Sequence, residues 1–149
     1  MISIPYKTKH VPVVGFKFRN LGGDGPKYDG PAGQTARLYG VHTLGSSTDT
    51  VLVCEGELDA LIGHQETGLP AVGVPGVSAW KTHYARVLEG YRRVLVLADN
   101  DADKDNNPGR ALAKRICEAL PQAQAITLPP GDLTDYVVAG GNVRELIEG

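Results

Sequence analysis

Short apolar runs alternate with amphipathic segments from residue 50 onward. The run at 51–54 is wholly apolar and the run at 93–98 nearly so, which is typical of strands covered on both faces. Elsewhere apolar residues recur at helical spacing, as at Leu112, Ile116 and Ala119. The pattern predicts these elements in order: strand 51–54, helix 57–66, strand 71–74, helix 78–88, strand 93–98, helix 108–120, strand 124–128, helix 132–139 and helix 143–148.

This alternation predicts an α/β fold, a Rossmann-type and mostly parallel sheet flanked by helices. In open sheets of this kind, ligands bind beyond the carboxyl ends of the strands. Glu55 follows the first buried strand and Asp99 follows the third. We therefore expect both carboxylates on the same edge of the sheet.

The first 49 residues have a different pattern, with several Gly- and Pro-containing turns. Within them, Phe16 and Phe18 alternate with Lys17 and Arg19. This alternation predicts a half-buried strand with a basic outer face. We expect a small β-rich N-terminal appendage here.

Charge divides the chain in the same place, which supports a basic segment over 1–49 and a main domain over 50–149. The net charge is −2, but residues 1–50 sum to +3 and the remainder to −5. Such a division is typical of a basic arm beside an acidic site, although two solvated faces would produce the same balance.

Composition excludes several classes of protein. The hydrophobic share of 42% and the charged share of 21% are ordinary for a globular domain. No apolar run approaches the ~18 residues that span a bilayer, and the N-terminal residues lack a signal-peptide pattern. Only Cys54 and Cys117 are present, so a disulfide scaffold is not expected. We expect a cytoplasmic protein without membrane contact.

Two acidic clusters, at 55–59 and 99–105, contain the candidate chemistry. Carboxylates gathered at one edge repel each other, and a hard divalent cation relieves that repulsion. Metal-assisted phosphoryl transfer is the corresponding chemistry. A calcium loop starting at Asp99 fails, because Lys104 stands where that loop needs Gly. The alternative role, capping helices and filling turns, applies most to Asp103.

These clusters resemble the two acidic motifs of the topoisomerase–primase (TOPRIM) domain. An E-G-x-x-D-A-L motif occupies 55–61, and a D-x-D motif occupies 99–101 after a second apolar strand. A Gly-containing turn at 74–76 lies between them, and a Pro/Gly-rich loop leads into an acid-containing helix at 128–136. The resemblance covers roughly 50–139 and is closest to the primases of bacteria and their phages.

The resemblance implies roles for individual residues. Glu55 would act as the acid/base or metal-organising carboxylate. Asp99 and Asp101 would hold Mg²⁺ or Mn²⁺. Asp59 and Asp103 would support them.

The N-terminal segment has a weaker similarity to the basic, Gly-rich region that precedes the TOPRIM domain in phage primases. Lys27-Tyr28 and the Leu-Tyr-Gly at 38–40 occupy the corresponding places. In that family the region helps to hold template and nucleotide. The resemblance therefore implies nucleic-acid contacts from Lys17, Arg19 and Lys27.

A primase of this kind makes RNA primers on a single-stranded DNA template from nucleoside triphosphates, in the host cytoplasm if a phage encodes it. The sequence has neither the Cys-ligated zinc module nor the helicase domain that accompanies such cores. We therefore expect a separate zinc-binding primase chain and the replicative helicase as partners. A TOPRIM nuclease and a non-catalytic nucleic-acid-binding module remain open alternatives.

Overall fold

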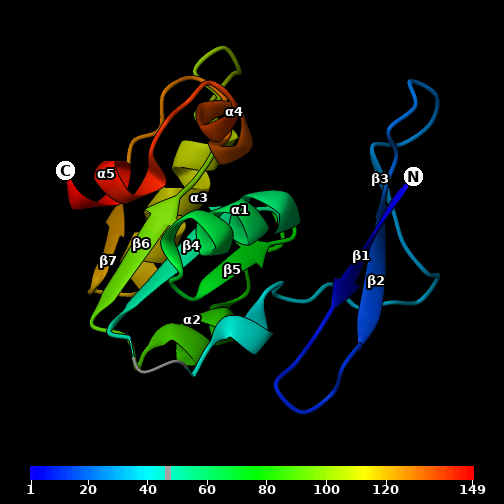
Figure 1. Cartoon of the computed structure of the whole chain (residues 1–149), viewed down its shortest axis with the longest axis horizontal. Coiled ribbons are helices and arrows are strands. Elements are labelled where there is room, and N and C mark those ends of the chain that lie inside the picture. Colours follow the sequence, from blue (N-terminus) through cyan, green and yellow to red (C-terminus); the bar gives the residue numbers. More distant parts are fainter. Residues whose placement is uncertain (46–47) are drawn as a thin grey trace.

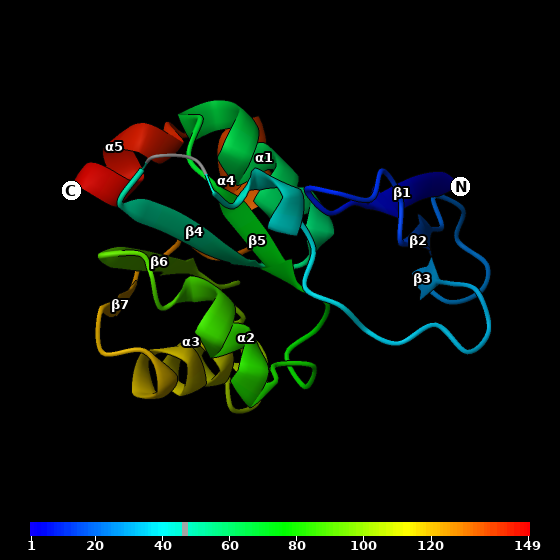
Figure 2. The same cartoon turned by 90° about the horizontal axis from the view of Figure 1, so that it is seen from below.

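A four-stranded parallel sheet lies at the centre of the computed structural model, which describes residues 1–45 and 48–149. The strands lie in the order β5-β4-β6-β7, and helices cover both faces (Figures 1 and 2). This arrangement confirms the expected α/β fold. The elements are β4 Thr50–Glu55, α1 Glu57–Thr67, β5 Ala71–Val74, α2 Thr82–Leu88, β6 Arg93–Leu97, α3 Pro108–Ala119, β7 Ala123–Ala125, α4 Leu133–Val138 and α5 Val143–Glu148.

Both faces of this sheet are buried, which explains the nearly continuous apolar runs. Val51 and Val53 of β4 belong to a core shared with α2 and α3. Leu52 and Cys54, which point the other way, belong to a second core shared with α1, α4 and α5. The parallel register pairs Leu52 with Leu95 of β6, so the two central strands end at the same edge.

A small antiparallel sheet stands beside the parallel one and consists of β1 Ile2–Tyr6, β2 Gly15–Arg19 and β3 Tyr28–Asp29. The connection to the main domain runs through Tyr39, which exchanges two backbone hydrogen bonds with Gly73 of β5, at 2.9 and 3.0 Å. Gly73 is required here because a Cβ would overlap the carbonyl of Gly56. Strand β5, at the edge of the parallel sheet, therefore lies directly between the N-terminal segment and the turn after Glu55.

The small sheet has the opposite orientation to the one expected. Lys17 pairs across the ladder with buried Ile4, so the basic face of β2 lies toward the main domain. The aromatic face carries Phe16 and Phe18, whose rings stack at 6.4 Å, and Phe16 is 38% exposed. The expected basic outer face is therefore wrong, because Lys17 on the inner face forms an ion pair with the buried Glu57 of the main domain. Ile4 and Tyr6, on the same face, join the apolar core of that domain.

Two element boundaries also differ by more than one residue from those expected. Helix α2 begins at Thr82 rather than at 78, because a turn with an Ala79–Gly76 hydrogen bond precedes it. Strand β7 ends at Ala125 rather than at 128, where the chain turns toward the loop that leads into α4. In the part of the chain that the structure describes, no helix is long and apolar enough to cross a membrane.

Candidate functional site

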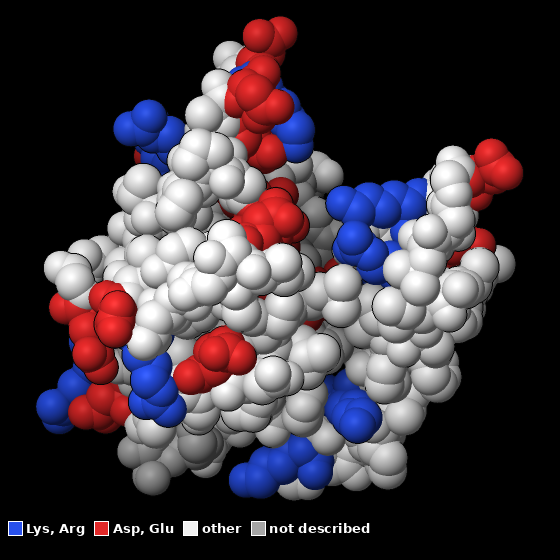
Figure 3. All heavy atoms as spheres, turned by 45° about the horizontal axis from the view of Figure 1, so that its top comes forward, with Lys and Arg blue, Asp and Glu red and all other residues white. Residues whose placement is uncertain are grey.

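A cavity of about 320 Å³ lies between the small sheet and the carboxyl edge of the parallel sheet, and we call it the central cavity. One wall is acidic and the other basic, and Figure 3 shows blue and red side chains facing each other across a hollow. The cavity brings together six of the eight residues expected from the sequence. These are Glu55, Asp59, Asp99, Lys17, Arg19 and Lys27.

Glu55 and Asp99 reach this cavity because their strands, β4 and β6, end side by side. Glu55 is the last residue of β4, and Gly56, with a φ of 99°, turns the chain directly into α1. Asp99 lies just beyond β6, and its backbone packs against Gly109 so closely that a Cβ there would overlap it. The expected shared edge is therefore present.

The electrostatics of the acidic wall favour a cation. Burial and the repulsion of nearby carboxylates, Glu55 first among them, raise the pKa of Asp99 from 3.8 to about 8. Burial followed by repulsion from Asp101 raises the pKa of Glu55. Glu55 Oε2 and Asp99 Oδ1 are both buried and accept no hydrogen bond from any residue that the structure describes. Buried carboxylate oxygens in this condition are energetically costly unless a positive charge compensates them.

Asp59 lines the cavity and also accepts hydrogen bonds that join two helices. Its Oδ1 accepts hydrogen bonds from the backbone N–H of Thr134 at 3.1 Å and from the Thr134 hydroxyl at 2.7 Å. Burial raises the pKa of Asp59 to about 6, although these hydrogen bonds oppose the shift. Asp59 thus fastens the start of α4 to α1.

Asp101 and Asp103 lie in the loop after β6 and do not line the central cavity. Asp101 forms an ion pair with Lys104, and Asp103 is exposed. Within residues 1–45 and 48–149, no three His, Cys, Asp or Glu side chains already stand together as a metal-binding group. The unpartnered oxygens of Glu55 and Asp99 nevertheless fit Mg²⁺, which takes one or two carboxylates together with substrate phosphates.

The basic wall is organised around one tyrosine ring. Lys17 Nζ lies 4.4 Å from the ring centroid of Tyr28, and Lys27 Nζ lies 5.9 Å from it. Arg19 donates a 2.6 Å hydrogen bond to the Tyr28 hydroxyl. Cations over an aromatic face are attracted by its quadrupole, so Tyr28 gathers three positive charges opposite the acidic wall.

Several residues of the site were not expected from the sequence. Asp132 and Asp135 line the cavity and form the capping box at the start of α4. In the sequence, the acid-containing loop before this helix was the only indication of them. The same pattern is equally typical of a helix cap without any other function. Glu57, which also lines the cavity, forms a buried pair with Tyr6, and no local pattern marks a contact between residues 51 positions apart.

Comparisons with known proteins identify the family to which the chain belongs. The sequence matches the Toprim domain family over residues 50–142. The chain belongs to the Toprim family. The Gene 57 protein of Mycobacterium phage D29 is a relative that is 33% identical over 99% of this chain and 95% of its own length. The resemblance to TOPRIM primases of the bacterial and phage type is thereby confirmed at the level of family, and solved structures extend it.

Over 98% of its own residues, this chain matches the structure of the primase catalytic core of E. coli, with a TM-score of 0.74 and 28% identity. It matches a primase domain from Pseudomonas aeruginosa with a TM-score of 0.77 and 26% identity. The primase fragment of the bacteriophage T7 primase-helicase shares the fold, with a TM-score of 0.75 at 23% identity. The chain spans about half the length of the two bacterial proteins, at 51% and 50%.

Proposed function

We propose that this chain is the catalytic Toprim core of a DNA primase, which synthesises RNA primers on single-stranded DNA by metal-dependent nucleotidyl transfer. One observation carries the proposal: the central cavity sets unpartnered carboxylates of the Toprim domain against the basic face of the small sheet. A nucleotidyl-transfer site needs both, because a metal ion must be held beside bound phosphates. The family resemblance supports the same assignment.

Each wall has a separate task in the proposed reaction. Asp99 and Asp101 would hold Mg²⁺ or Mn²⁺, with Asp59 and Asp103 in support. The metal, when bound, would stabilise charge on the attacking 3′-oxygen and on the leaving pyrophosphate. Glu55 would organise the metal or accept the proton of the 3′-hydroxyl as that oxygen bonds to the α-phosphorus.

The basic wall would bind the substrates. Lys17, Arg19 and Lys27 present cations to phosphate groups, and polyphosphates and nucleic-acid backbones are held mainly by such contacts. Single-stranded DNA and nucleoside triphosphates are therefore the proposed ligands. We further propose a separate zinc-binding primase chain and the replicative helicase as partners, in the cytoplasm of the host.

A template assay separates this proposal from its alternatives. The chain, alone and with the protein encoded by the neighbouring gene, is incubated with single-stranded DNA, labelled ribonucleoside triphosphates and Mg²⁺ or Mn²⁺. Template-dependent RNA products support a primase. Cleavage of the template without incorporation would instead indicate a Toprim nuclease, and tight binding without either reaction would indicate a non-catalytic module.

A further inference from the structure

Glu57 is a buried carboxylate at the boundary between the small sheet and the Toprim domain. It is the first residue of α1 and only 1% exposed. Its Oε1 accepts a hydrogen bond from the Tyr6 hydroxyl of β1 and a 2.7 Å ion-pair contact from Lys17 Nζ of β2. Its Oε2 is buried and accepts no hydrogen bond from the described residues. One side chain thus joins two strands of the small sheet to the helix that follows Glu55.

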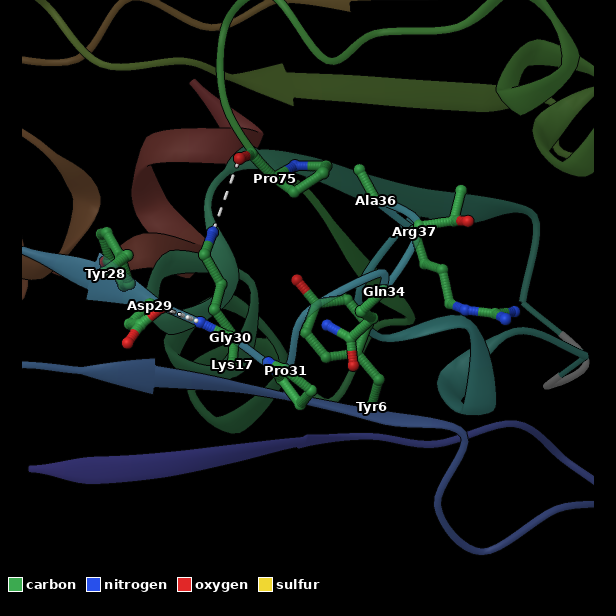
Figure 4. Close-up of a pocket in the computed structure, with 11 residues that line it drawn as sticks. Tyr6, Lys17, Tyr28, Asp29, Gly30, Pro31, Gln34, Ala36, Arg37 and Pro75 are labelled. Carbon is green, nitrogen blue, oxygen red and sulfur yellow. Dashed lines mark hydrogen bonds between the residues drawn. The ribbon is translucent and has the colours of Figure 1, made fainter.

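The ion pair with Glu57 holds Lys17 between two neighbouring cavities. Its ammonium lies 3.5 Å from the carbonyl of Pro75, in the turn after β5 (Figure 4). The same ammonium lies over the ring of Tyr28. The residue lines the central cavity and also a neighbouring pocket of about 310 Å³, which includes Tyr6 and Arg37. Lys17 is therefore held where these two hollows meet.

The other cations of the basic wall are placed differently. Arg19 contacts Tyr28, and Lys27 is exposed. Among the residues that the structure describes, Lys17 is the one of these three that forms an ion pair with a carboxylate. A long Lys side chain loses considerable rotamer freedom when it is fixed, and the buried partner makes that fixation possible.

We propose that Glu57 is a positioning residue: it holds the Lys17 ammonium at the junction of the two hollows, ready to contact a phosphate group of a nucleoside triphosphate. Through Tyr6 the same carboxylate keeps the small sheet docked on α1. The ligand in this proposal rests on the proposed function. The positioning of Lys17 by Glu57 is independent of that function, and a separate measurement tests it.

The variant Glu57→Gln should change the affinity for the nucleotide in opposite directions, depending on whether Glu57 acts only through its charge or by positioning Lys17. A carboxylate beside a phosphate site repels the ligand, so removing its charge would raise affinity if charge were all that mattered. If Glu57 positions Lys17, the same variant loses a charge-assisted contact to the phosphate. We then expect affinity to fall about ten-fold.

The first measurement needs no ligand. The folded protein is treated with a limiting amine-acylating reagent, and the labelling of each Lys is read by peptide mass analysis. Lys17 should react more slowly than Lys27 in the wild type, and Glu57→Gln should increase its labelling several-fold while Lys27 stays constant. Glu118→Gln is the matched control, because it removes one exposed charge on α3. Unchanged labelling of Lys17 in Glu57→Gln would overturn the positioning role.

The second measurement is a double-mutant cycle on binding of a fluorescent ATP analogue with Mg²⁺. If Glu57 acts through Lys17, Lys17→Met lowers affinity and Glu57→Gln causes no further loss in that background. Additive losses, or tighter binding by Glu57→Gln, would refute the proposal. Melting temperature and circular dichroism verify that each variant is folded. A wild type that binds no analogue would refute the proposed function, while the labelling result would still decide whether Glu57 holds Lys17.

Discussion

Replacing Asp99 by Asn removes the carboxylate whose ionisation the fold disfavours most clearly. Its pKa lies at about 8 in the folded protein, against an ordinary value of 3.8. Between these values the unfolded chain has released the proton while the folded chain keeps it. The folded state then binds more protons, so this group lowers stability as the pH rises from about 4 to about 8. Asn does not titrate and removes that dependence.

The size of the effect follows from the shift. Over the three pH units from 5 to 8, each unit is worth ~1.4 kcal/mol, which gives an upper value of ~4 kcal/mol. Asp99 is only partly buried, and solvent screening reduces this to roughly 2 kcal/mol. Relative to the wild type, Asp99→Asn should therefore gain about 2 kcal/mol of unfolding free energy between pH 5 and pH 8.

Urea unfolding followed by circular dichroism, in a chelator and at several pH values, measures this difference. Asp103→Asn provides the matched control, because it makes the same change at an exposed position in the neighbouring loop. The difference between the Asp99→Asn and Asp103→Asn curves isolates the contribution of the cavity carboxylate. If these two curves are parallel, Asp99 has an ordinary pKa and the argument for a cation site at this carboxylate fails.

Three further outcomes follow from the same geometry. Mg²⁺ should raise the melting temperature by binding the folded state, and Asp99→Asn combined with Asp101→Asn should abolish that rise; an undiminished rise would place the metal elsewhere. Replacing Arg19 or Lys27 by Ala should weaken single-stranded DNA binding and reduce its salt slope by roughly 0.7 each, whereas unchanged slopes would make the small sheet purely structural. Gly109→Ala should destabilise the fold by about 1–3 kcal/mol through overlap with the Asp99 backbone, and an unchanged melting temperature would contradict that packing.

The parallel sheet was predictable because its information is local. A strand covered on both faces must be apolar at every position, as at 51–54, and the residue that follows it must lie at the carboxyl edge. The joint placement of Glu55 and Asp99 follows from this rule alone. Strand and helix boundaries were less predictable, because turns such as the one before Thr82 depend on specific hydrogen bonds.

The small sheet was predictable in kind but not in orientation. Alternation in residues 15–19 reveals two faces without telling which one is inside, since that depends on what lies opposite. Here Glu57 lies opposite, 40 residues from Lys17 in sequence, and it draws the basic face inward. Contacts of that separation have no periodic signature, which is why the contacts among Tyr6, Glu57 and Lys17 are visible only in three dimensions.

The most direct test of the proposed primase activity is the rate of primer synthesis by Glu55→Gln, measured beside its affinity for single-stranded DNA. Gln keeps the shape of the side chain but removes its charge and its ability to exchange a proton. We expect the rate to fall ~10²–10⁴-fold, as for loss of acid–base assistance, while affinity is nearly unchanged because the phosphate contacts come from Lys and Arg. A variant that synthesises primers at the wild-type rate would contradict the catalytic assignment of Glu55 and the account built on it.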